Sequence, residues 1–174
     1  MGRSDVLFAS FVQMPTPTTI TFSYTAYAWN ELPAADQALL KDAHAAALRA
    51  YARYSKFMVG AALRTTAGKV VTGNNQENAS FPAGICAERT ALHAAMSMEP
   101  DAIVETMAIV VPSVTGDRPV SPCGICRQAL LEQEVRQDRK PIRLLMGTPD
   151  GTVHELKSAG ALLPLSFDGS FLEG

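Results

Sequence analysis

Polar and apolar residues alternate along Thr18–Thr25, near the start of the chain. The segment is rich in β-branched and aromatic residues, and Ile20, Phe22 and Tyr24 fall on one side of it. A period of two is typical of a half-buried strand. We therefore predict a strand over residues 18–25, within an N-terminal extension that covers residues 1–31.

A helical period follows Pro33, a residue that suits the first turn of a helix. Strong helix formers run from Ala34 to Tyr51, and the apolar positions among them predict a buried stripe. Beyond this helix, the pattern predicts further helices over 86–98 and 123–135, a turn at 148–151, and strands over 57–63, 69–73, 103–111, 142–146 and around Val153. After the first helix and a hairpin, strands and helices alternate, which predicts an α/β fold with helices on the faces of a sheet.

Composition narrows the class of protein. The chain has 174 residues, 47% of them apolar and 18% charged, which fits one compact globular domain. The formal net charge is −2 and no run of Lys or Arg occurs, which argues against a nucleic-acid partner. No apolar run approaches the roughly 20 residues that span a bilayer, so we expect no membrane association. An odd number of cysteines fits a reducing cytoplasm better than a disulfide framework, and we expect a cytoplasmic protein.

The three cysteines have the spacing of metal ligands. Cys123 and Cys126 lie three residues apart at the start of a predicted helix, and Cys86 begins another. The positive end of a helix dipole favours thiolate over thiol. A lone Cys-x-x-Cys pair is ambiguous between zinc binding and redox chemistry, but a third thiol in the same setting favours zinc. We consider His93 a poor fourth ligand, because it lies nearly two helical turns beyond Cys86. Three ligands leave a position for water, as in catalytic zinc sites.

Glu88 lies two positions after Cys86. In a regular helix the two side chains would point in different directions, so both reach one cavity only if Cys86 is at the very N-terminus. A carboxylate beside a zinc-bound water is a candidate general acid/base. An acidic residue that stabilises the helix dipole is the alternative, and Glu88 alone does not decide between them.

Two segments, Cys86-Ala87-Glu88-Arg89-Thr90-Ala91 and Pro122-Cys123-Gly124-Ile125-Cys126-Arg127-Gln128, resemble the signature segments of cytidine deaminases. The similarity extends from about residue 33 to residue 167 and includes residues 54–62 and 75–80. Cysteine as the first ligand, in place of histidine, resembles the small homotetrameric members of the family. Arg53 departs from the pattern, in which Pro is frequent, and the N-terminal extension is longer than usual.

The resemblance implies a three-layer α/β/α fold with a mixed, roughly five-stranded sheet, to which the N-terminal extension can add a strand. It places the catalytic domain at residues 32–172, and we expect residues 173–174 to be a cloning remnant. One zinc ion per chain would be held by Cys86, Cys123 and Cys126. In this family zinc-bound hydroxide attacks C4 of cytidine or 2′-deoxycytidine, which yields uridine or 2′-deoxyuridine and ammonia in pyrimidine salvage. Glu88 would be the proton shuttle.

The resemblance also assigns residues around the site. Arg89 and Arg127 would hydrogen-bond the ligand sulfurs and withdraw electron density from them. Asn75 and Glu77 would bind the ribose hydroxyls, although turn chemistry is an alternative for Asn75. Further substrate contacts would come from Phe57, Ala87 and Phe167. In the homotetramer, Phe167 would reach the active site of a neighbouring chain and pack on the base.

Three other functions compete with this interpretation. A structural zinc module would need a fourth protein ligand, which the sequence does not offer. A nucleic-acid editing deaminase would show a basic face, which the net charge of −2 argues against. A deaminase of another cytosine nucleoside, such as blasticidin S, would share the zinc chemistry and differ only in its substrate.

Overall fold

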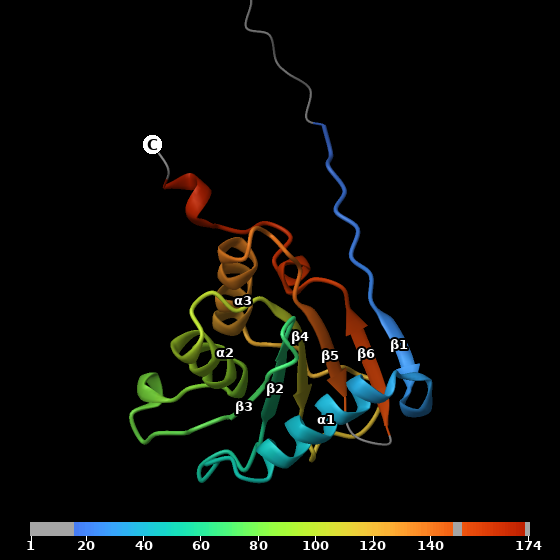
Figure 1. The fold of residues 1–174 in the computed structure, drawn as a ribbon, viewed down its shortest axis with the longest axis vertical. Coiled ribbons are helices and arrows are strands. Elements are labelled where there is room, and N and C mark those ends of the chain that lie inside the picture. Colours follow the sequence, from blue (N-terminus) through green and yellow to red (C-terminus); the bar gives the residue numbers. More distant parts are fainter. Residues whose placement is uncertain (1–15, 148–150, 173–174) are drawn as a thin grey trace, which may run out of the picture.

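The computed structural model describes residues 16–147 and 151–172, and its centre is a mixed sheet of six strands (Figure 1). The strand order is β1-β6-β5-β4-β2-β3, with β4 and β5 parallel and all other neighbours antiparallel. The strands are β1 (Thr25–Ala28), β2 (Gly60–Thr65), β3 (Val70–Asn74), β4 (Val104–Val110), β5 (Arg143–Gly147) and β6 (Thr152–Leu156). The predicted turn at 148–151 falls largely outside the described residues, as do residues 173–174.

Helices cover both faces of the sheet (Figure 1). Helix α1 (Ala34–Ala47) packs on one face, and α2 (Ala87–Met98) and α3 (Gly124–Arg136) pack on the other. Each face has its own cluster of buried apolar side chains. This arrangement confirms the predicted three-layer α/β/α fold class. Short 3-10 turns are η1 (Trp29–Glu31), η2 (Phe81–Ala83), η3 (Ala159–Leu162) and η4 (Gly169–Phe171). Within the described residues, no helix is both long and apolar enough to cross a membrane.

The predicted strand over 18–25 is wrong in position. The strand that the extension contributes is β1, which pairs with β6 from Thr25↔Glu155 to Ala28↔Thr152. Because β6 ends at Leu156, the backbone just before Thr25 has no strand beside it in the part of the chain that the structure describes. Residues 16–24 form an extended arm, which we call the N-terminal arm, and the apolar side chains on it are about half exposed rather than buried.

Two other boundaries differ because tertiary contacts override local pattern. The first helix ends at Ala47 rather than Tyr51, since Tyr51 forms a β-bridge with Gln76. The strand expected from residue 57 begins at Gly60. Before it, the Phe57 amide donates to Ser55 Oγ and the Val59 amide to Asn75 Oδ1, so side chains take the place of a regular ladder there, with one backbone bond from the Asn75 amide to the Val59 carbonyl.

Glycines allow the helices to lie close to the sheet. A Cβ on Gly60 would come within 1.9 Å of the Ala43 carbonyl oxygen in α1. A Cβ on Gly73 would come within 2.4 Å of the Ala91 amide nitrogen in α2. Contacts this short are possible only without a side chain. Gly73 therefore sets how deeply α2, which begins next to Cys86, sits on the sheet.

Candidate active site

Three thiols meet where two helices begin. Cys86 is the N-cap residue of α2, Cys123 is the N-cap residue of α3, and Cys126 lies in the first turn of α3. The Sγ atoms of Cys86 and Cys123 are 3.7 Å apart, and those of Cys123 and Cys126 are 3.5 Å apart. All three sulfurs lie within 4.8 Å of one another. Both helices therefore direct the positive ends of their dipoles towards one cluster of sulfurs.

The donor set and its spacing fit a zinc ion. Sulfurs of a tetrahedral zinc site with bonds of about 2.3 Å lie about 3.8 Å apart, close to the distances observed between these thiols. Among the described residues this is the one group of three or more metal-ligating side chains with such spacing. His93 is exposed on α2 and does not belong to it. Three thiolates would leave a fourth tetrahedral position for a water molecule or a substrate.

The charges around the cluster favour a thiolate at Cys86. A hydrogen bond from the Cys126 thiol, helped by Arg89 and Cys123, outweighs burial and lowers the pKa of Cys86 to about 5. The pKa of Cys126 is raised, because its proton is held by Cys86 and the thiol is largely buried. Burial opposes the charge of Arg89, yet its contacts with Cys86 and Cys126 outweigh that cost and raise its pKa.

Arg89 also has an unused donor. Its Nε atom is buried and has no hydrogen-bond partner among the described residues. An unpaired buried donor is costly, and a metal-bound thiolate is an acceptor that would satisfy it. Because the guanidinium contacts Cys86 and Cys126, this unused donor fits thiolate ligands of a metal cation.

Glu88 is buried beside the thiols, in the first turn of α2. Its side chain is 5% exposed, and burial raises the pKa of its carboxyl, with a further increase from the charge of Cys86. Cys86 has extended backbone angles as the N-cap, which meets the geometric condition under which both side chains share one cavity. Ala87, fully buried, lies between them. A buried carboxyl whose pKa is raised above its ordinary value is a candidate for accepting and donating protons.

Asn75 and Glu77 lie beside the cluster because Gln76, between them, pairs with Ile85 just before Cys86. Both side chains bond to the preceding loop. Glu77 accepts from the Tyr54 amide at 2.7 Å, from the Ser55 amide at 3.3 Å and from the Ser55 hydroxyl, and the last of these bonds contributes most to lowering the pKa of Glu77.

Asn75 holds the other end of that loop. Its Oδ1 accepts from the Val59 amide at 2.8 Å and its Nδ2 donates to the Phe57 carbonyl at 2.9 Å. Phe57, 39% exposed, is thereby fixed between the two. The contact of Glu77 with Ser55 was not predicted, although both residues lie in segments that carry the family resemblance.

Arg127 bonds to main chain and a hydroxyl in this structure, not to sulfur as the resemblance implied. Its Nε donates to the Pro122 carbonyl at 2.8 Å, and its two Nη atoms donate to the Leu162 carbonyl at 3.3 Å and to Ser121 Oγ at 3.2 Å. It therefore joins the turn that carries Cys123 to the C-terminal segment. The next residue, Gln128, also joins α3 to the C-terminal segment, since its Nε2 donates to the Phe167 carbonyl at 2.9 Å. This contact was not predicted from the sequence.

Phe167 is not enclosed by its own chain. Its side chain is 58% exposed and stacks on Phe171, with ring centroids 5.7 Å apart. Figure 1 shows that this C-terminal segment projects from the body of the molecule beyond α3. The structure thus brings Glu88, Arg89 and the three thiols into one cluster, and leaves the side chain of Phe167 more than half exposed.

Comparison with known proteins gives matches to cytidine deaminases. The model of the cytidine and deoxycytidylate deaminase zinc-binding region matches residues 33–138. The cytidine deaminase of Halalkalibacterium halodurans is 42% identical over 131 residues, which are 75% of this chain and 92% of that protein.

Solved structures agree with the sequence relatives. The cytidine deaminase of Burkholderia pseudomallei is similar at a TM-score of 0.64 and 40% identity, over 75% of this chain and 97% of that one. The enzyme of Mycobacterium tuberculosis is similar at a TM-score of 0.56 and 36% identity, over 75% and 95% of the two chains. Together with the cysteine cluster, these matches establish that the chain belongs to the cytidine and deoxycytidylate deaminase family.

Proposed function

We propose that this protein is a zinc-dependent cytidine deaminase, which converts cytidine or 2′-deoxycytidine and water to uridine or 2′-deoxyuridine and ammonia. The observation that carries the proposal is the buried carboxyl of Glu88 beside three thiols at the N-termini of two helices. Cys86, Cys123 and Cys126 would hold one zinc ion per chain. When bound, zinc makes a water molecule acidic enough to supply a nucleophile at neutral pH.

Glu88 would perform the proton transfers. It accepts a proton from the attacking water and passes one to N3 of the pyrimidine ring, which makes C4 more electrophilic. It then takes the proton of the new C4 hydroxyl and delivers it to the amino group, so that the C4–N bond breaks, ammonia departs and the C4 carbonyl forms. Its raised pKa suits these alternating roles, because a group that both takes and gives protons works best when its pKa lies near the working pH.

Arg89 would balance the charge of the thiolates. Three thiolates on a divalent cation carry a formal charge of −1, which works against acidification of water. The Arg89 guanidinium faces two of the sulfurs and carries one unused buried N–H. A hydrogen bond from it to sulfur would withdraw electron density from the metal.

The sugar would be recognised by Asn75 and Glu77, and the base by Phe57, Ala87 and Phe167. The Asn75 side chain bonds to the loop that carries Phe57 through Oδ1 and one Nδ2 hydrogen, which leaves the second Nδ2 hydrogen free to donate. An ionised Glu77 can still accept a hydrogen bond from a hydroxyl. We propose that both residues bind ribose while they hold the loop that carries Phe57. Free cytosine, which lacks the sugar, would then be a poor substrate.

We further propose a homotetramer with shared active sites. The exposed aromatic ring of Phe167, on a segment that projects from the body, supports a role in a neighbouring chain's site. Three unpaired thiols in the described structure support a reducing, cytoplasmic location.

The decisive experiment measures deamination directly. The zinc-loaded protein is incubated separately with cytidine, 2′-deoxycytidine, cytosine, deoxycytidine monophosphate and blasticidin S, while loss of cytosine absorbance and release of ammonium are recorded. We expect turnover of the two nucleosides and little with free cytosine. Turnover confined to blasticidin S would assign the chain to a different nucleoside, and no turnover of any compound would reject the proposed function.

A further inference from the structure

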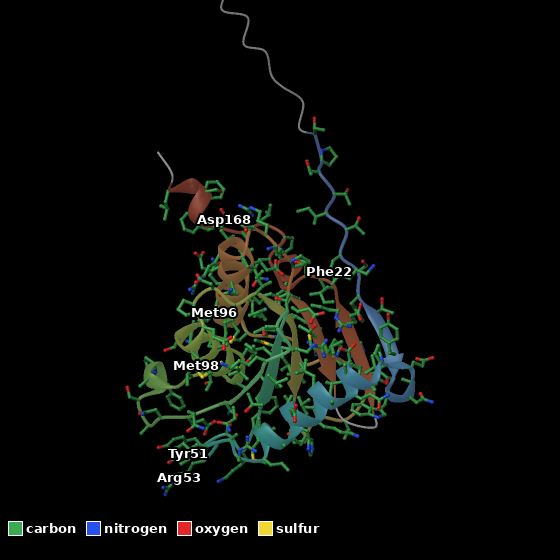
Figure 2. All side chains as sticks on the ribbon, in the orientation of Figure 1. Phe22, Tyr51, Arg53, Met96, Met98 and Asp168 are labelled. Carbon is green, nitrogen blue, oxygen red and sulfur yellow. The ribbon has the colours of Figure 1, made fainter. Side chains whose placement is uncertain are left out.

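The N-terminal arm forms one wall of a cavity that lies apart from the thiols and Glu88. The cavity has a volume of about 370 Å³, within the range of small-molecule sites. Phe22 and Tyr24 line it from the arm, and Figure 2 labels Phe22 there. Met146 of β5 and Leu162 of the C-terminal segment also line it. None of the side chains with a role in the proposed reaction lines this space, although Arg127, which holds the turn that carries Cys123, does so.

The walls are apolar and partly aromatic. The rings of Phe22 and Tyr24 lie 6.2 Å apart and are tilted by 48°, and each side chain is about half exposed. Half-exposed aromatic rings around a cavity favour a flat apolar ligand, which would remove their surface from water. Because the family match begins at residue 33, Phe22 and Tyr24 belong to a part of the chain that the family model does not cover.

The polar end of the cavity is positive. Arg127 and Ser121 line it, and no acidic side chain among the described residues does so. An arginine has five N–H donors, and Arg127 uses three of them on Pro122, Ser121 and Leu162. Two donors with a full positive charge remain, and their natural partner is a carboxylate, sulfonate or phosphate oxygen.

We propose that this cavity binds a small organic anion whose flat apolar body packs on Phe22 and Tyr24 while its acidic group contacts Arg127. Arg127 also holds the Pro122 carbonyl, next to Cys123. A ligand in the cavity would therefore contact the residue that fixes the metal-binding turn. The site is formed jointly by the N-terminal arm, the loop before Cys123 and the C-terminal segment.

A matched pair of probes tests both halves of the proposal on the zinc-loaded full-length protein. The anion 8-anilino-1-naphthalenesulfonate and the neutral N-phenyl-1-naphthylamine share one aromatic body and differ in the sulfonate. Fluorescence titration should give saturable binding of one sulfonate probe per chain, at least about tenfold tighter than the neutral probe, because a charge-assisted hydrogen bond is lost without the sulfonate.

Variants locate the bound probe. Ala161 is exposed and lines the cavity, so Ala161→Trp should fill the space and weaken the sulfonate probe at least about tenfold. Ala67→Trp, at the exposed turn between β2 and β3, is the matched control and should bind as wild type does. Tyr24 is half exposed and belongs to neither buried apolar cluster, although its ring also lies 5.5 Å from that of His154. Tyr24→Ser removes this ring from the cavity and should weaken the probe several-fold, with thermal unfolding as the check on the fold.

Four results would overturn the proposal. Equal affinity for the two probes would show that the cavity has no preference for an anionic ligand. Unchanged binding to both Ala161→Trp and Tyr24→Ser would place the probe elsewhere. Displacement of the sulfonate probe by saturating uridine would place the probe in the nucleoside site. Absence of binding to the native oligomer would mean that a second copy of the chain covers the cavity. None of these outcomes depends on turnover, so the proposed deamination is tested separately.

Discussion

Replacing Gly73 by alanine should displace the helix that carries Cys86 and Glu88. The added Cβ would lie 2.4 Å from the Ala91 amide nitrogen and 2.6 Å from the Ala87 carbonyl oxygen. Both atoms belong to the backbone of α2, so no side-chain rotation can relieve the contact. Because ordinary contacts of a Cβ begin at 3.4 Å, α2 must move away from β3 by about 1 Å.

Two effects of different size follow from that shift. Overpacking of a close contact costs about 1–3 kcal/mol, which for a chain of this length lowers Tm by roughly 2–12 °C. A catalytic group misplaced by about 1 Å can lose about 10²-fold in rate. We therefore expect Gly73→Ala to remain folded at 25 °C and to unfold at a lower temperature. Its kcat/KM should fall by about 10²-fold, a larger loss than the decrease in Tm alone would suggest.

The assay compares thermal unfolding and kcat/KM for cytidine in wild type, Gly73→Ala and Gly169→Ala. Gly169 is the matched control, because a Cβ there meets no atom within 4 Å. It should retain wild-type Tm and activity. If Gly73→Ala also kept both, the close approach of β3 and α2 would not determine the geometry of the site, and the reasoning would be refuted.

Four further predictions address the chemistry. Glu88→Gln should keep the fold and the zinc but lose about 10²–10⁴-fold in turnover, and a variant with a tenth of wild-type turnover would rule out its role as proton shuttle. Cys126→Ala should lose stoichiometric zinc by metal analysis; full zinc with full activity would mean that the ligand is another residue. Glu77→Ala should deaminate cytidine less efficiently and narrow the preference for nucleoside over free cytosine, and wild-type efficiency would contradict sugar recognition. Mixing Phe167→Ala chains with Glu88→Gln chains should restore activity once subunits exchange, because some sites then combine an intact Glu88 with an intact Phe167. No recovery after confirmed exchange would mean that each chain completes its own site.

The fold class could be predicted from the sequence because the spacing of apolar residues that marks each helix or strand is local in the chain. Most helices and strands are found within a few residues of their predicted positions, since each buries a face whose spacing the sequence records. The boundaries that failed depend on distant partners. Tyr51 leaves the helix to pair with Gln76, and the arm stops being a strand where β6 ends. No local pattern specifies where a partner begins or ends.

Three thiols with ligand spacing, each at or near a helix start, and a carboxylate two residues after the first of them can be read from the sequence alone. These features are local, because a helix N-terminus orients its own first turn. Tertiary structure alone decided the distances between the sulfurs, the burial that raises the pKa of Glu88, and the direction of the Arg127 guanidinium towards Pro122, Ser121 and Leu162. Those properties depend on how α2 and α3 pack on one face of the sheet, which brings together residues far apart in the chain.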